Sequence, residues 1–173
     1  PAPAVVPAAA APAQPAVLPF EWVTPAKPAD QGVTCVPVFD LRPAAGDFSD
    51  QQTPELTGWA RPRLSRKITR DMFIAQVCGK SMEPKIPDGS WCLFTRDVAG
   101  SRHGRILLVQ HRDLHDPDTG SRYTVKEYRR PPQDAAKSGV LTGTISLHPL
   151  NPAYKDFPLT AAQAVYLAVV GEW

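Results

Sequence analysis

The chain has 173 residues, of which 43% are hydrophobic and 21% charged, and its formal net charge at pH 7 is only +2. This composition supplies enough apolar material for one core, and the balanced charge argues against a protein built mainly to bind nucleic-acid phosphates. The 20 prolines are unevenly placed and divide the chain into two parts.

The first part is a segment rich in Ala, Pro and Val that carries no charge over residues 1–19. Prolines interrupt every apolar run there, which is typical of a polyproline-like linker rather than a membrane span or a signal peptide. We predict a flexible linker over residues 1–33 and one domain over residues 34–173. The apolar island Phe20-Glu21-Trp22-Val23 is expected to anchor the linker on that domain.

The second part shows the short alternating or apolar runs that indicate strands, separated by glycine and proline. Pro37 lacks a backbone N–H, so the first strand is expected at a sheet edge, and the stretch Ser49–Trp59 is expected to be turn-rich. Little helix is indicated, so we predict a mostly β fold with a strongly bent and twisted sheet. The expected strands are Thr34–Phe39, Met72–Val77, Trp91–Thr95, Arg105–His111, Arg122–Tyr128, Val140–Leu147 and Ala164–Val170, with Arg105–His111 and Arg122–Tyr128 forming a hairpin.

Ser81 stands just past the strand Met72–Val77, after Gly79 breaks the pattern. A serine in such a turn can be held with its hydroxyl facing outward, but it needs a base to act as a nucleophile at neutral pH. The best candidate is Lys126, on the same strand face as Thr124. A lysine is a base only when neutral, so its pKa of about 10.4 must fall by several units, which burial achieves.

Four motifs follow one another in a fixed order. They are Gly79-x-Ser81-Met82-x-Pro84, Ile86-x-Asp88-Gly89, Gly104-Arg105-Ile106-Leu107-Leu108-Val109 and Tyr123-Thr124-Val125-Lys126. Together they resemble the self-cleaving peptidase domain of LexA, UmuD and the lambdoid phage repressors, and the resemblance runs from about Val36 to Trp173. It implies a LexA-like β-fold, Ser81 as nucleophile and Lys126 as general base. No cofactor or metal is expected. The backbone N–H groups of Lys80 and Ser81 are expected to stabilise the oxyanion.

Members of that family are cut in their own chain, between a small residue and a glycine upstream of the serine. The stretch Leu41–Phe48 is similar to this cleavage region, and Ala45–Gly46 is the candidate scissile bond. Small side chains suit a peptide bond that must enter a tight cleft. Pro43 departs from the pattern, because it lacks the N–H that an extended substrate uses to pair with a strand.

Three interpretations are weighed, and a signal-peptidase-like enzyme is placed last among them. The domain is either a self-cleaving regulator of a larger DNA-damage or defence protein, or a non-cleaving dimerisation and sensing module attached to a DNA-processing enzyme. A type I signal peptidase shares the Ser-Met-x-Pro motif and a lysine base, but the residues after Lys126, Glu127-Tyr128-Arg129, do not match those after the signal-peptidase lysine. The resemblance implies the chain's own cleavage loop as substrate, a homodimer, and a RecA-like or defence-system activator in an SOS-type or phage-defence response.

Several weaker signals favour ordinary structural roles. The basic cluster Arg61–Arg70 is interpreted as a solvated loop, so no nucleic-acid binding is predicted. The side chains of His111, Asp113, His115 and Asp116 are interpreted as a polar hairpin tip rather than metal ligands. The three cysteines Cys35, Cys78 and Cys92 show no CxxC pair, which indicates reduced thiols in a cytoplasmic protein.

Overall fold

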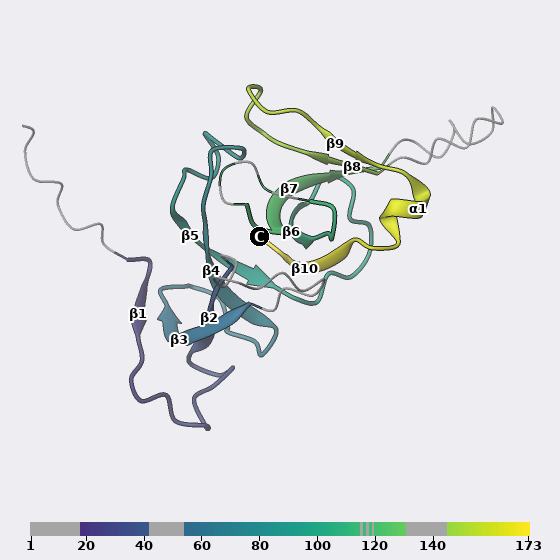
Figure 1. Ribbon diagram of the computed structural model, residues 1–173. Coiled ribbons are helices and arrows are strands. Elements are labelled where there is room, and N and C mark those ends of the chain that lie inside the picture. Colours follow the sequence, from purple (N-terminus) through teal and green to yellow (C-terminus); the bar gives the residue numbers. More distant parts are fainter. Residues whose placement is uncertain (1–17, 42–53, 115, 117, 119, 131–144) are drawn as a thin grey trace, which may run out of the picture.

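A computed structural model of the chain describes residues 18–41, 54–114, 116, 118, 120–130 and 145–173. Its ten strands form one sheet in the order β1-β3-β2-β4-β5-β10-β6-β7-β8-β9, and Figure 1 shows this sheet curving strongly around β6 and β7. The predicted mostly β fold is therefore confirmed. The elements are β1 (Phe20–Trp22), β2 (Val36–Asp40), β3 (Glu55–Pro62), β4 (Met72–Val77), β5 (Ser90–Thr95), β6 (Ile106–Gln110), β7 (Tyr123–Arg129), β8 (Ile145–His148), β9 (Phe157–Leu159), α1 (Ala161–Ala164) and β10 (Ala168–Glu172).

The strand β6 is apolar without alternation because both of its faces are buried. Its even-numbered side chains, Ile106 and Leu108, belong to one core cluster. Its odd-numbered side chains, Leu107 and Val109, belong to a second cluster on the opposite face. The bent sheet thus has a core on each side of β6, and most side chains of the neighbouring β7 are buried as well.

The hairpin predicted from the sequence is confirmed, since β6 and β7 pair antiparallel with Leu107 opposite Lys126. On its other side β7 pairs with β8, starting with Glu127 opposite His148. Lys126 therefore lies on a strand with neighbours along both edges, and the backbone ladder fixes the position of its Cα atom.

Two expectations about the first strands were wrong. The strand β3 occupies part of the stretch that was predicted to be turn-rich, and it lies between β1 and β2. The strand β2 is not at an edge, because it pairs with β3 and also with β4. Pro37 is accommodated there because the parallel pairing with β4 begins only at Val38.

The C-terminal part also differs from the prediction. The strand expected over Ala164–Val170 begins only at Ala168, because Ala164 is the last residue of the short helix α1. A capping box formed by Thr160 and Gln163 starts this helix. The strand β10 lies inside the sheet, between β5 and β6. The exposed edge that suggested a homodimer is thus not present at β10, and the dimer stays a prediction. Only residues 145–147 of the expected strand Val140–Leu147 are described, and they belong to β8.

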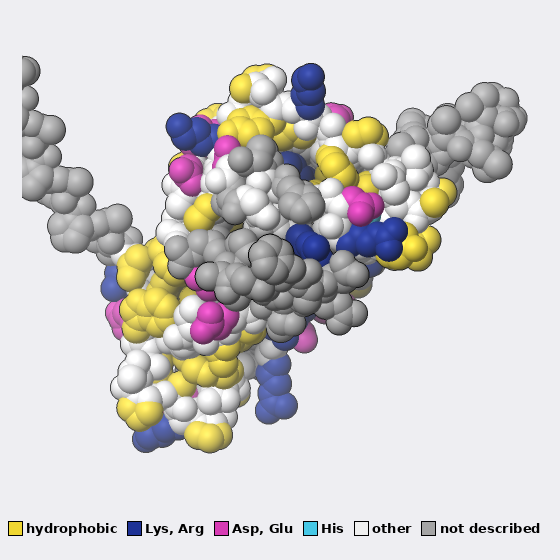
Figure 2. All heavy atoms as spheres, viewed as in Figure 1, with side chains coloured by type: hydrophobic (Ala, Val, Ile, Leu, Met, Phe, Trp, Pro, Cys, Tyr) yellow, Lys and Arg dark blue, Asp and Glu magenta, His cyan; other side chains and the backbone are white. Residues whose placement is uncertain are grey.

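The apolar island near the N-terminus forms β1, which pairs with β3. Phe20 is buried and packs edge-to-face against Trp22 and Trp91. Figure 2 shows hydrophobic side chains gathered at this β1–β3 end of the visible face. The expected anchor is therefore a strand of the sheet, while the linker over residues 1–33 stays a prediction, with residues 1–17 outside the described residues. No helix in the described part of the chain is long and apolar enough to cross a membrane.

Candidate active site

Ser81 follows a turn that requires a glycine. Gly79 has a φ of +98°, in the left-handed region, and its N–H donates to Asp88 Oδ1 at 2.7 Å. A Cβ atom at Gly79 would lie 2.7 Å from Asp118 Oδ2, which is closer than real Cβ contacts. Both the backbone angle and the space thus exclude a side chain there.

Hydrogen bonds from a distant loop hold the backbone on both sides of Ser81. The side chain of Asn151 donates to the Lys80 carbonyl at 2.8 Å, and its backbone N–H donates to the Ser81 carbonyl at 3.0 Å. Met82 and Ile86, next in the chain, are buried in the core. The Ser81 hydroxyl is consequently carried on a turn that is tied to the body of the domain.

The amine of Lys126 meets this hydroxyl. Its Nζ atom lies 2.7 Å from Ser81 Oγ, within hydrogen-bond distance. Nζ also donates to Thr124 Oγ1 at 2.6 Å and to the Val125 carbonyl at 3.1 Å. Only 8% of Lys126 is exposed. The structure therefore brings together the two side chains that the sequence predicted as nucleophile and base, although they are 45 positions apart.

Burial lowers the pKa of Lys126 below its ordinary value, because the charged amine loses its water shell. The carboxylates of Asp116 and Asp118 oppose that effect and raise the pKa, but burial dominates. A lowered pKa increases the fraction of neutral amine at a given pH. The direction of this shift is the one that a lysine base requires.

The loop between β6 and β7 contributes a carboxylate that sequence reasoning did not assign to this site. Asp116 Oδ2 accepts a hydrogen bond from the Thr124 hydroxyl at 2.9 Å and lies 3.9 Å from Lys126 Nζ. Asp116 is buried. The sequence offered one signal, an acidic residue in the turn just before the strand that carries the base, and it was interpreted as part of a polar hairpin tip.

Asp118, two residues on, reaches the Ser81 turn itself. Its Oδ2 atom accepts from the Lys80 N–H at 2.9 Å, and the Tyr154 hydroxyl donates to both carboxylate oxygens at 3.0 and 3.2 Å. The hydrogen bond to Asp118 is the main cause of a raised Tyr154 pKa. The N–H of Lys80, expected to be an oxyanion donor, therefore donates to a carboxylate in this structure, and its oxyanion role stays a prediction.

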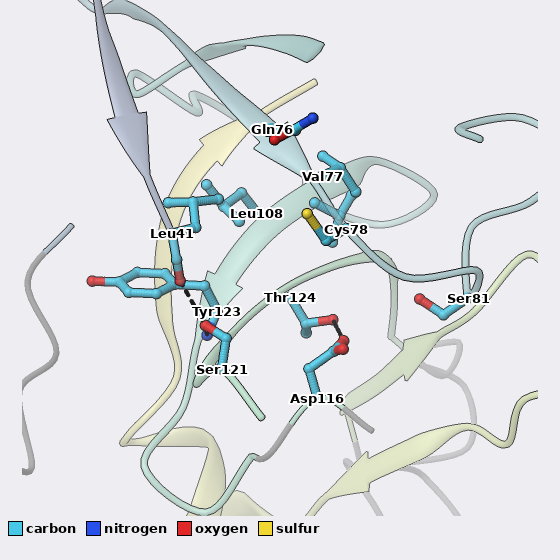
Figure 3. Close-up of a pocket in the computed structure, with 11 residues that line it drawn as sticks. Leu41, Gln76, Val77, Cys78, Ser81, Leu108, Asp116, Ser121, Tyr123 and Thr124 are labelled. Carbon is cyan, nitrogen blue, oxygen red and sulfur yellow. Dashed lines mark hydrogen bonds between the residues drawn. The ribbon is translucent and has the colours of Figure 1, made fainter. Parts of the chain in front are cut away.

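A small cavity opens beside Ser81 and is lined in part by Asp116 and Ser121 of the β6–β7 loop. Figure 3 shows Leu41 at its far end, close to Ser121 and Tyr123, with the Thr124–Asp116 pair between them and Ser81. The Ser121 hydroxyl donates to the Leu41 carbonyl at 2.8 Å. The chain that leads to the candidate cleavage segment is thus fixed beside the site, while Ala45 and Gly46 lie outside the described residues.

Comparison with known proteins identifies the class. The Peptidase S24-like family model matches residues 37–172, which include both Ser81 and Lys126, so this is a serine-peptidase-type domain. The chain belongs to the Peptidase S24-like family, and the LexA-like resemblance read from the sequence is confirmed. A search of curated proteins found no match.

Proposed function

We propose that the domain is a self-cleaving serine peptidase in which Ser81 and Lys126 form the catalytic dyad and Ala45–Gly46 is the scissile bond. The observation that supports this most is the 2.7 Å contact between Ser81 Oγ and the buried Lys126 Nζ. A buried amine in contact with a serine hydroxyl is the arrangement that activates a weak nucleophile. Membership of the Peptidase S24-like family supports the same chemistry.

The reaction proceeds through an acyl-enzyme. Neutral Lys126 takes the proton of Ser81 as Oγ attacks the carbonyl carbon of Ala45 and forms a tetrahedral intermediate. The protonated amine then gives this proton to the nitrogen of Gly46, and the C–N bond breaks. Water attacks the ester between Ala45 and Ser81, with Lys126 again taking and returning a proton, and the chain leaves as two pieces.

Stabilisation of the oxyanion requires a change at Asp118. The N–H groups of Lys80 and Ser81 are the proposed donors, and each such donor contributes about 3 kcal/mol in known enzymes. Because the Lys80 N–H donates to Asp118 in this structure, the carbonyl oxygen of Ala45 must replace that carboxylate. Docking of the cleavage segment and displacement of Asp118 are therefore one step, which offers a point of control.

Enzyme and substrate are parts of one chain, so the effective concentration of the scissile bond is high without a pocket for other proteins. We propose that cleavage regulates a larger cytoplasmic protein of a DNA-damage or defence response, acting as a homodimer under a RecA-like or defence-system activator. The alternative is a non-cleaving sensing or dimerisation module. Pro43 and the occupied Lys80 N–H favour that alternative.

The test is the intact mass of the purified chain after incubation from pH 7 to alkaline pH. We expect fragments that end at Ala45 and begin at Gly46, and faster cleavage as the pH rises, because a rising pH increases the neutral fraction of Lys126. Ser81→Ala and Lys126→Ala should stay whole.

The matched control for this test is Lys85→Ala, which removes an amine that lies over the Trp173 ring and not in the dyad. It should cleave like the parent chain. Cleavage that persists in Ser81→Ala would show a different nucleophile. A parent chain that stays whole at every pH would support the non-cleaving module.

A further inference from the structure

A buried carboxylate lies beside an amine that has to be neutral to work. The side chain of Asp116 is only 5% exposed, and its Oδ2 atom is 3.9 Å from Lys126 Nζ. A negative charge at that distance favours the charged amine and so opposes the chemistry. The proposed dyad does not need Asp116, so the position of this residue requires its own explanation.

The hydrogen bonds give one part of the explanation. The Thr124 hydroxyl has a single proton and donates it to Asp116, because an ionised carboxylate only accepts. Thr124 must therefore accept from Lys126, and the Val125 carbonyl can also only accept. A neutral amine has two N–H groups, and these two acceptors use both. Its lone pair is then left facing Ser81 Oγ, the atom it has to deprotonate.

The charged side chains around Lys126 Nζ give the other part of the explanation. Asp116 makes the closest charged contact to Nζ that the described residues show, and Asp118 acts in the same direction from the same loop. Tyr154, Lys155 and Asp156 line a cavity with Lys126 on the β8–β9 side, and Lys80 and Glu83 belong to the Ser81 turn. Of these side chains, Asp116 is the one buried against both Thr124 and Lys126.

We propose, on the basis of the proposed self-cleavage, that Asp116 is a positioning residue that acts on Lys126 in two ways. Through Thr124 it directs the lone pair of the amine toward Ser81. Through its charge it keeps the amine protonated over a wider pH range and so restrains cleavage at neutral pH. The β6–β7 loop thereby sets the pH at which the peptidase becomes active.

The central experiment compares the pH profile of self-cleavage in the parent chain, Asp116→Asn and Asp116→Ala. Both substitutions remove the charge, so the midpoint of each profile should fall by about one pH unit or more. Where the plateau rate is kept, this corresponds to about tenfold faster cleavage at pH values below both midpoints. The asparagine keeps an acceptor for Thr124 and the alanine does not, so the plateau rate should fall further in Asp116→Ala.

The control is Asp113→Asn, which removes an equal charge from the same loop at a half-exposed side chain paired with Arg112. The midpoint of its pH profile of self-cleavage should match that of the parent chain. Thermal unfolding of each variant shows whether the domain is folded. Asp116→Ser supplies a second neutral substitution with a smaller side chain, should the buried asparagine disrupt the fold.

A second readout does not depend on cleavage. In the Ser81→Ala background, the titration of Lys126 is followed by NMR of its labelled ε-carbon, with and without Asp116→Asn. A midpoint lowered by Asp116→Asn supports the inference even if the parent chain is never cut, in which case only the proposed function fails. An unchanged or raised midpoint in folded protein overturns the inference, whether or not the parent chain cleaves.

Discussion

The two halves of the candidate dyad are held by different means. Ser81 lies on an irregular turn whose shape depends on Gly79 at positive φ and on side chains from distant loops, such as Asn151. Lys126 lies in a regular strand with paired neighbours on both sides. The turn thus depends on a glycine and on a few specific contacts, whereas the unfavourable energy at the strand lies in burying an amine.

This difference indicates which substitutions would disturb the Ser81 turn and which would disturb Lys126 on its strand. A side chain added at Gly79 would meet Asp118 and disturb the turn, whereas the strand that carries Lys126 is paired with β6 and β8. The strand is instead sensitive to whatever alters the charge of its buried amine. Three substitutions separate these two kinds of sensitivity.

The largest effect is expected from Gly79→Ala. The new Cβ atom meets Asp118 and forces the turn to move, and a displacement of about 1 Å at a reacting atom can lower the rate by about a hundredfold. Cleavage is measured by intact mass. The matched control is Gly104→Ala, which has a similar φ of +76° but no atom within 4 Å of the added Cβ. Both variants should lose about 1–2 kcal/mol of stability, and equal cleavage in the two would refute the argument.

The second-largest effect is expected from Lys126→Met, in how the free energy of unfolding depends on pH. Burial holds the pKa of Lys126 below its ordinary 10.5, so between the folded value and 10.5 the unfolded chain binds more protons. The contribution of Lys126 to the free energy of unfolding therefore rises with pH in that interval, by at most about 1.4 kcal/mol per pH unit. Urea unfolding of Ser81→Ala, with and without Lys126→Met, should show the methionine variant becoming less stable relative to its parent as the pH rises toward 10.5. The opposite slope would mean that the nearby carboxylates outweigh burial.

The smallest effect is expected from Glu127→Ala, beside Lys126 in β7. Glu127 accepts a hydrogen bond from Arg129 at 2.9 Å, but this partly exposed ion pair does not place the amine. The backbone ladder does so, and the initial rate of cleavage should change less than about twofold. A tenfold loss would show that the strand is as fragile as the turn.

Much of the fold was predictable because its signals are local. The run Met72–Val77 was predicted as a strand with the same ends that it has in the structure. The β6–β7 hairpin was equally clear, since an apolar run and an alternating run flank a loop rich in turn residues. The strand β3 was missed because Pro54 and Gly58 resemble turn material, whereas pairing on both sides holds the segment extended.

The site was predictable only in part. Ser81 and Lys126 stand in short motifs that can be read along the chain. Asp116 and Asp118 have no such motif, and Asp118 meets the Lys80 N–H across 38 positions and the Tyr154 hydroxyl across 36. Contacts of this kind depend on how the loop folds back over the sheet, which neither periodicity nor composition records. The sequence therefore identified the two candidate reacting groups, whereas the carboxylates beside them were missed.

The hydrogen bond between Ser121 and the Leu41 carbonyl has a further consequence. Ala45 comes four positions after Leu41, and an extended chain covers at most about 3.6 Å per residue. The candidate bond can therefore lie at most about 14 Å along the chain from Leu41, which lines the same cavity as Ser81. For the proposed self-cleavage, the length of this segment therefore limits which peptide bonds can reach Ser81, in addition to any preference for local sequence.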